Sequence, residues 1–175
     1  MMSGESLFMA SYSATVDNAK VSFASTVPGS VIPLDVSNTR YTIQKGAFLV
    51  AESTVTLSTV FSTKIGRGLF GGEGFILQRL GGKGTAFIEI DGDSIVMDLK
   101  PGEVIKVQTG NLVAFENGVK YDIETVKGLG NVLFGGEGLF LTRLTGPGRV
   151  ILQTMCLSDF AGRISEHIPM QSNQY

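Results

Sequence analysis

The sequence is short of the residue types on which most metal sites and nucleophilic catalysts depend. It has one histidine and one cysteine in 175 residues. A cupin-like metal centre needs two or three histidine ligands, so that class is excluded. A Ser-His-Asp or Cys-His arrangement would rest on His167, in a C-terminal segment that we expect to be exposed. No catalytic residue is predicted, and the protein is expected not to be an enzyme.

Cysteine and charge are scarce in other informative ways. Cys156 has no second cysteine to pair with, which excludes an internal disulfide and fits a reducing compartment. It follows an apolar run and is predicted to be a packed side chain rather than a nucleophile. Charged residues make up only 17% of the chain, against about 25% in typical domains. This shortage predicts that some surface is hidden, for instance in an oligomer interface.

Long apolar runs and targeting signals are also missing. No stretch reaches the ~18 apolar residues that a membrane-spanning helix needs. The first twenty residues have no basic region before an apolar one, so they do not form a secretory signal. They contain no arginine, which makes them a poor mitochondrial presequence. The net charge of −2 gives no general attraction to nucleic acid or anionic membranes.

What the chain has is a long internal repeat. LFGGEGFILQRLGGKG at 69–84 returns as LFGGEGLFLTRLTGPG at 133–148, with 11 of 16 positions identical and an offset of 64 residues. The offset also aligns Glu52 with Glu116 and Gly66 with Gly130. A repeat of this length predicts a duplicated structural unit. The full copies are 20–83 and 84–147, and the partial copies are 1–19 and 148–157.

Glycine, at 23 residues, clusters between short runs of β-branched and aromatic residues, which predicts many short strands joined by turns. Asp91-Gly92 is a strong turn signal, and Asn117-Gly118 is a strong hairpin signal. The expected strands are 20–26, 31–36, 40–44, 48–52, 55–61, 75–80, 85–90, 94–99, 104–108, 112–116, 120–126 and 139–144, with another opening at 148.

Only the end of the chain has a helical period. Leu157, Phe160, Ala161 and Ile164 form an apolar stripe, with Ser158 as the expected N-cap. We therefore predict an all-β body over 1–169, a short helix at 158–168 packed on it, and a tail at 170–175.

The repeat motifs also carry a family resemblance. SGESLFM, the two LFGGEG motifs, GNLVAFENGVKYDI and GPGRVILQTM together make the chain resemble the altered-inheritance-of-mitochondria protein family. The resemblance implies the fold of the tryptophan RNA-binding attenuator protein: a pseudo-threefold prism or sandwich of short antiparallel strands, often in oligomers. Family members usually have roughly fifty further residues before the SGESLF-like segment, so we expect a shortened member or a fragment. The implied location is the cytoplasm for a prokaryotic source and the mitochondrion for a eukaryotic one.

Four charged residues in the repeats are candidate ligand contacts: Glu73 and Glu137, and Arg79 and Arg143 six residues later in each copy. Glu5 is a third acid of the same kind. The carboxylates could bind a cation or polar ligand near a shared axis. They could instead accept hydrogen bonds from amides of their own turns, which is the interpretation we favour. The arginines could bind an anion or, as we favour, pair with carboxylates of a neighbouring repeat.

Two further ligand classes find little support. The runs Gly66-Arg67-Gly68, Gly71-Gly72 and 81–84 precede strands, whereas a phosphate loop precedes a helix. Lys and Arg total 14 against 16 acids and form no aromatic-basic stripe, so nucleic acid is not expected.

The leading hypothesis is therefore a non-enzymatic scaffold or binding protein, without a cofactor or metal. It is expected to self-associate and to recruit an unknown protein partner, with any membrane association made through that partner. The apolar pairs Leu69-Phe70 and Leu133-Phe134 would serve core packing or self-association, and core packing is favoured. A small-ligand binder with a cleft between repeats is the alternative, and RNA binding is a third.

Overall fold

The computed structural model describes residues 9–63, 74–125 and 140–168, and it is an all-β fold with one C-terminal helix. Glu5, Glu73, Glu137 and the apolar pairs at 69–70 and 133–134 lie outside these ranges. The first set of strands is β1 (Gly29–Asp35), β2 (Tyr41–Gln44), β3 (Phe48–Ala51), β4 (Val55–Thr63), β5 (Phe75–Gly82) and β6 (Thr85–Asp91). The second set is β7 (Ser94–Leu99), β8 (Val104–Gln108), β9 (Leu112–Glu116), β10 (Lys120–Thr125), β11 (Phe140–Thr145) and β12 (Gly148–Gln153), followed by α2 (Leu157–His167).

The two sets of strands correspond one to one at the 64-residue spacing. Short 3₁₀ turns, at Lys45–Ala47 and Thr109–Asn111, also recur at that spacing between the second and third strand of each set. Pairings recur as well: β6 lies between β1 and β3, as β12 lies between β7 and β9. We call β1–β6 the first unit and β7–β12 the second unit. The threefold arrangement stays a prediction, because the structure describes these two units.

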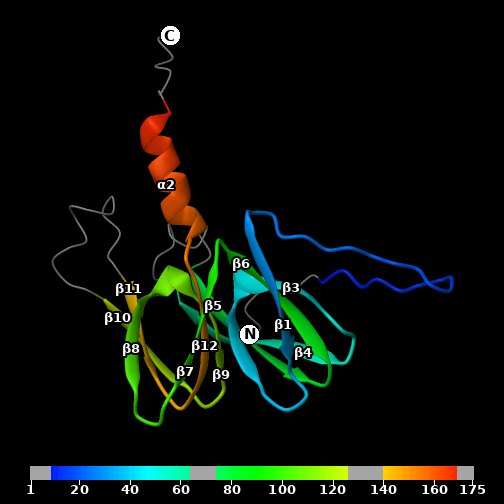
Figure 1. The fold of residues 1–175 in the computed structure, drawn as a ribbon, viewed down its shortest axis with the longest axis horizontal. Coiled ribbons are helices and arrows are strands. Elements are labelled where there is room, and N and C mark those ends of the chain that lie inside the picture. The colour runs from blue at the N-terminus through cyan, green and yellow to red at the C-terminus, as the bar shows by residue number, and fades with distance from the viewer. Residues whose placement is uncertain (1–8, 64–73, 126–139, 169–175) are drawn as a thin grey trace, which may run out of the picture.

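The strands form three antiparallel sheets, and one of them is shared by both units. Sheet A has the order β1-β6-β3, sheet C the order β10-β11-β8, and sheet B the order β4-β5-β2-β9-β12-β7. Sheet B is continuous because β2 of the first unit pairs with β9 of the second. The body therefore has two lobes that are joined through sheet B (Figure 1).

Two hydrophobic clusters lie on opposite faces of sheet B. Ile151 of β12 belongs to the cluster that contains Leu34, Ala86 and Ile88 of sheet A. Its neighbours Val150 and Leu152 belong to the cluster that contains Leu144 of sheet C. Successive residues of a strand point to opposite faces, so sheet B is the middle layer between sheets A and C.

Most strand predictions are confirmed, but the turn signals misled about pairing. Asn117-Gly118 does make a tight turn, in which the Val119 amide donates to the Glu116 carbonyl oxygen at 3.0 Å. It links β9 of sheet B to β10 of sheet C, so the predicted hairpin is wrong. Asp91-Gly92 likewise links sheet A to sheet B. In this fold the tight turns carry the chain between layers, because each layer draws its strands from distant segments.

The expected strand at 20–26 is also wrong. Residues 9–28 form two limbs that leave the body and turn back near residues 15–18, and no strand is assigned there (Figure 1). Tyr12 and Phe23 make an edge-to-face contact between the limbs, with ring centroids 5.4 Å apart. A strand requires a partner strand, and the structure gives these residues none.

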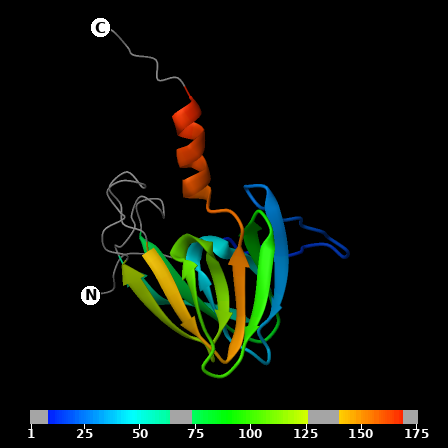
Figure 2. The ribbon, with the colours of Figure 1, turned by 60° about the vertical axis from the view of Figure 1, so that its left-hand side comes forward.

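The helix is found where predicted, but it does not pack on the body. It projects away from the sheets, and none of its residues is buried (Figures 1 and 2). Its N-cap is Cys156 and no side chain caps the first turn, so Ser158 lies inside the helix rather than at its cap. No helix within the described residues is long and apolar enough to cross a bilayer.

Candidate functional site

The two candidate arginines lie exposed on different sheets. Arg79 lies on β5, opposite Thr42 and Ser58, and Arg143 lies on β11, opposite Lys106 and Asp122. Neither has an ion pair with a described residue. Their predicted partners Glu73 and Glu137 lie outside the described residues, so the ligand and ion-pair interpretations both stay predictions.

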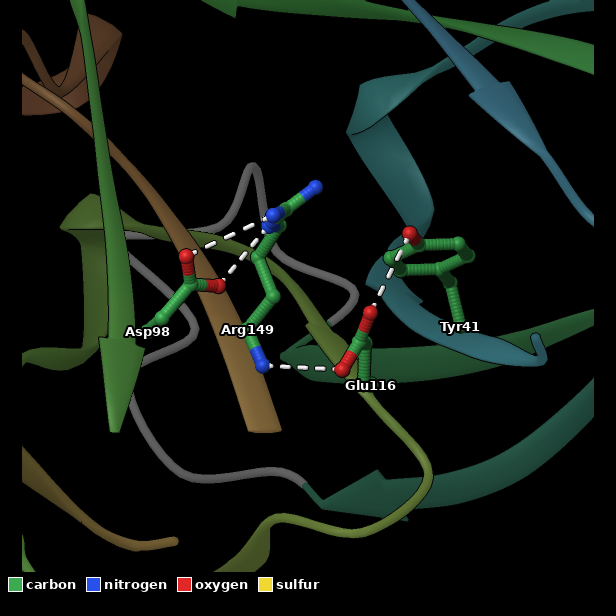
Figure 3. Close-up of polar contacts among 4 residues, drawn as sticks. All are labelled: Tyr41, Asp98, Glu116 and Arg149. Atoms are coloured by element: carbon green, nitrogen blue, oxygen red, sulfur yellow. Dashed lines mark hydrogen bonds and ion pairs between the residues drawn. The ribbon is translucent and has the colours of Figure 1, made fainter. Parts of the chain in front are cut away.

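The best-defined polar cluster is one that the sequence did not suggest. Tyr41, Glu116, Arg149 and Asp98 come from β2, β9, β12 and β7, across the join between the units (Figure 3). The Tyr41 hydroxyl donates to Glu116 Oε1 at 3.4 Å, and the Arg149 amide donates to Glu116 Oε2 at 3.0 Å. The Arg149 guanidinium donates from Nε to Asp98 Oδ1 at 2.9 Å and from Nη2 to Asp98 Oδ2 at 3.4 Å.

The electrostatics of this cluster agree with its geometry. Burial, and then the negative charge of Glu116, raises the pKa of Tyr41. The hydrogen bond from Arg149 lowers the pKa of Asp98, and the same contact raises the pKa of Arg149. Each charged or phenolic group already has a partner within the cluster. The arrangement therefore links four neighbouring strands through their side chains.

One part of the cluster recurs in the first unit. Glu52, the counterpart of Glu116, accepts a hydrogen bond from the Thr85 amide at 2.6 Å, and Thr85 is the counterpart of Arg149. Each carboxylate lies beside a glycine with positive φ, which is Gly84 at +117° and Gly148 at +138°. In the sequence, the alignment of Glu52 with Glu116 at the repeat offset was the signal that could have identified these carboxylates. A carboxylate bound to a backbone amide is therefore observed for Glu52 and Glu116, whereas the same role for Glu73 and Glu137 stays a prediction.

A second polar group holds the base of the helix. Gln108 donates from Nε2 to Asp159 Oδ2 at 2.8 Å, and the carboxylate of Asp91 accepts a hydrogen bond from the Leu157 amide. Cys156 is buried, as predicted, and packs against Gly110. The first turn of the helix is thus tied to the last residues of β6 and β8.

Beyond that base, the apolar stripe of the helix is uncovered. Leu157, Phe160, Ile164 and Ile168 are 48%, 46%, 43% and 60% exposed. They lie at the spacing of one helix face. We call these four residues the α2 stripe. A stripe of this kind normally packs on another apolar surface, so the α2 stripe is a candidate docking surface.

Asp91 gives a test of the helix base through pH. Burial, followed by the negative charge of Glu89, raises the pKa of Asp91 above its ordinary value of 3.8. The folded state therefore holds this proton more tightly than the unfolded state, and its contribution to stability falls as pH rises through the folded-state pKa. We expect the stability of wild type relative to Asp91→Asn to decrease as pH rises from 3.8. Urea unfolding of both proteins across a pH series measures this, and parallel pH profiles would contradict it.

No group of three or more His, Cys, Asp or Glu side chains is placed to hold a metal ion within 9–63, 74–125 and 140–168.

Three comparisons with known proteins agree. Residues 1–155 match the family described as mitochondrial biogenesis AIM24. An uncharacterised protein of Streptococcus pyogenes serotype M6 is 29% identical over 174 residues, which are 99% of this chain and 68% of that relative. A crystal structure of a Streptococcus pyogenes protein superposes with a TM-score of 0.67 and 23% identity, over 82% of this chain. This chain spans 62% of that second protein, and at this identity the likeness supports the fold alone.

Proposed function

The chain belongs to the mitochondrial biogenesis AIM24 family, and from this premise we propose that it is a non-enzymatic scaffold. It associates with itself and docks a protein partner on the α2 stripe. Any contact with a membrane is made through that partner.

The α2 stripe carries this proposal. A short isolated helix is marginal in water, and here the first turn is fixed by Gln108 and Asp91 while the apolar face stays open. This is the geometry of an amphipathic helix that is presented to an apolar groove. The charges on α2 are mixed in sign, with Asp159 and Glu166 beside Arg163. An anionic membrane surface attracts basic helices, so a protein groove is the better match.

The polar cluster supports a structural rather than a catalytic role. Tyr41, Glu116, Arg149 and Asp98 are bound to one another, so a substrate would first have to break these contacts. The small-ligand alternative would use Arg79 and Arg143, which are exposed but lie on separate sheets.

The partner on α2 can be tested with a photo-reactive amino acid in the cells that contain the protein. Placed at Ile164, on the stripe, it should give a discrete protein adduct. Placed at Glu166, on the opposite face, it should give little. With the captured protein purified, Phe160→Ser should weaken binding about 30-fold, which corresponds to roughly 2 kcal/mol for a central apolar contact.

Glu166→Ser is the matched control, because it changes the same helix on its polar face and should leave affinity unchanged. Equal adducts from Ile164 and Glu166, or no effect of Phe160→Ser on binding, would reject α2 as the docking helix.

A further inference from the structure

β3 and β8 are edge strands, although their counterparts in the other unit are internal strands. The counterparts β1 and β7 are both edge strands, and so are the counterparts β4 and β10. β2 and β9 are internal, because they pair with each other. Their counterparts β8 and β3 are edges of sheets C and A. Among the described residues, these two edges are therefore unpaired, whereas the equivalent edges of β2 and β9 pair with each other.

Burial shows the same asymmetry. In β9 the four apolar residues 112–115 are all buried, whereas in β3 the counterparts Phe48–Ala51 are only half-buried. In β2 residues 41–43 are buried, whereas their counterparts in β8 are not: Ile105 and Val107 are half-buried and Lys106 is exposed. The same positions thus gain burial only where the junction is formed.

Both open edges are suited to accept a strand. An unpaired apolar edge presents free amides and carbonyls that can pair with another chain. Natural edge strands commonly carry charges that prevent this. In β3 there is no charged residue, and the one charge of β8, Lys106, is neutralised within the same molecule by Glu124 at 2.6 Å.

We propose that β8 of one molecule pairs with β3 of a second copy, in the antiparallel register of the β2–β9 junction. That junction places Tyr41 opposite Glu116, Thr42 opposite Phe115 and Ile43 opposite Ala114. Replacing each β2 residue by its β8 counterpart and each β9 residue by its β3 counterpart gives the proposed register. It places Ile105 opposite Glu52, Lys106 opposite Ala51 and Val107 opposite Val50. The proposal rests on the self-association that forms part of the proposed function, and it names the surfaces involved.

A second copy is the occupant that the fold itself supports. It carries both edges, and the β2–β9 junction shows that strands of these two types fit each other. β8 and β3 lie on different lobes (Figure 1), so one molecule offers one edge of each type. The contact is head to tail, and its repetition gives a ring or a filament.

Site-directed disulfides test the register. In a background with Cys156→Ala, one chain carries Ala51→Cys and a tagged chain carries Lys106→Cys. Directly opposite residues have Cβ atoms about 4.5–5.5 Å apart, so mild oxidation of the mixture should give mainly the mixed dimer. Val96→Cys is the control, because Val96 is 51% exposed on β7, which is an edge strand like its counterpart β1. Mixed with Ala51→Cys, it should give no dimer above background.

A second pair, Val50→Cys with Val107→Cys, repeats the test one residue along, and circular dichroism confirms that each variant is folded. If both cysteine pairs gave no more mixed dimer than the Val96→Cys control, the proposed junction would be overturned. The same result would be obtained if another polypeptide covered the two edges. Sedimentation of wild type separates the two proposals. A mass above 18.6 kDa without mixed dimers rejects only this junction, whereas 18.6 kDa at every concentration rejects self-association as well.

Discussion

Replacing Phe115 with alanine should lower the free energy of unfolding by about 3–5 kcal/mol, the usual cost of removing a buried aromatic ring. Phe115 lies on β9 near the centre of sheet B and is 2% exposed. It is opposite Thr42 of β2 and Val150 of β12, so it supports both the join between the units and the second unit's own pairing. Its ring centroid lies 5.3 Å from that of Tyr121 on sheet C. The deletion would therefore leave a cavity between two layers.

Phe160→Ala is the matched control, because it removes the same ring from α2, where the residue is 46% exposed. We expect Phe160→Ala to change the free energy of unfolding by less than roughly 0.5 kcal/mol. Urea denaturation followed by circular dichroism compares the two. Similar losses from both variants would mean that the α2 stripe is buried in solution or that β9 is not central to the core.

The second large effect is expected at Gly84. Its φ of +117° disfavours any side chain, and a Cβ there would lie far too close to Oε2 of Glu52. Gly84→Ala should therefore strain the backbone and displace the carboxylate that accepts the Thr85 amide. We expect a loss of about 2–3 kcal/mol in the free energy of unfolding.

Gly102 separates the two causes. It has a φ of +78°, but a Cβ there would meet nothing within 4 Å. Gly102→Ala should cost about 1 kcal/mol, from backbone conformation alone. If both variants lost the same amount, the contact between Gly84 and Glu52 would have no energetic weight.

The sequence predicted local structure well because local patterns decide it. The bounds of β7, β8 and β9 agree with the alternation and turn residues on either side of them. The pairing of the strands could not be predicted in the same way. A turn such as Asn117-Gly118 reverses the chain whether or not the flanking strands share a sheet, so its residues do not reveal that β9 and β10 lie in different layers.

The same limit applies to the candidate site. Tyr41, Asp98, Glu116 and Arg149 are brought together by the register of four strands, which no local pattern encodes. The amphipathic stripe of α2 predicted a helix, but it could not say whether the body of the same molecule would cover it. Residues 20–26 have strand-like composition, yet strand formation depends on partners as much as on the residues themselves.

Because the tight turns connect different sheets, most strands pair with partners that are distant in the sequence, and this affects the order of folding. Among the described strands, only β4–β5 and β10–β11 pair as neighbours along the chain. β1 must wait for β6, and β7 must wait for β12. Folds dominated by such distant pairings form slowly, so on the ribosome sheet B can be completed only after β12 has emerged. Until β9 has emerged, the nascent first unit exposes β2 without its partner strand, and a chaperone or a neighbouring nascent chain would meet that unpaired strand first.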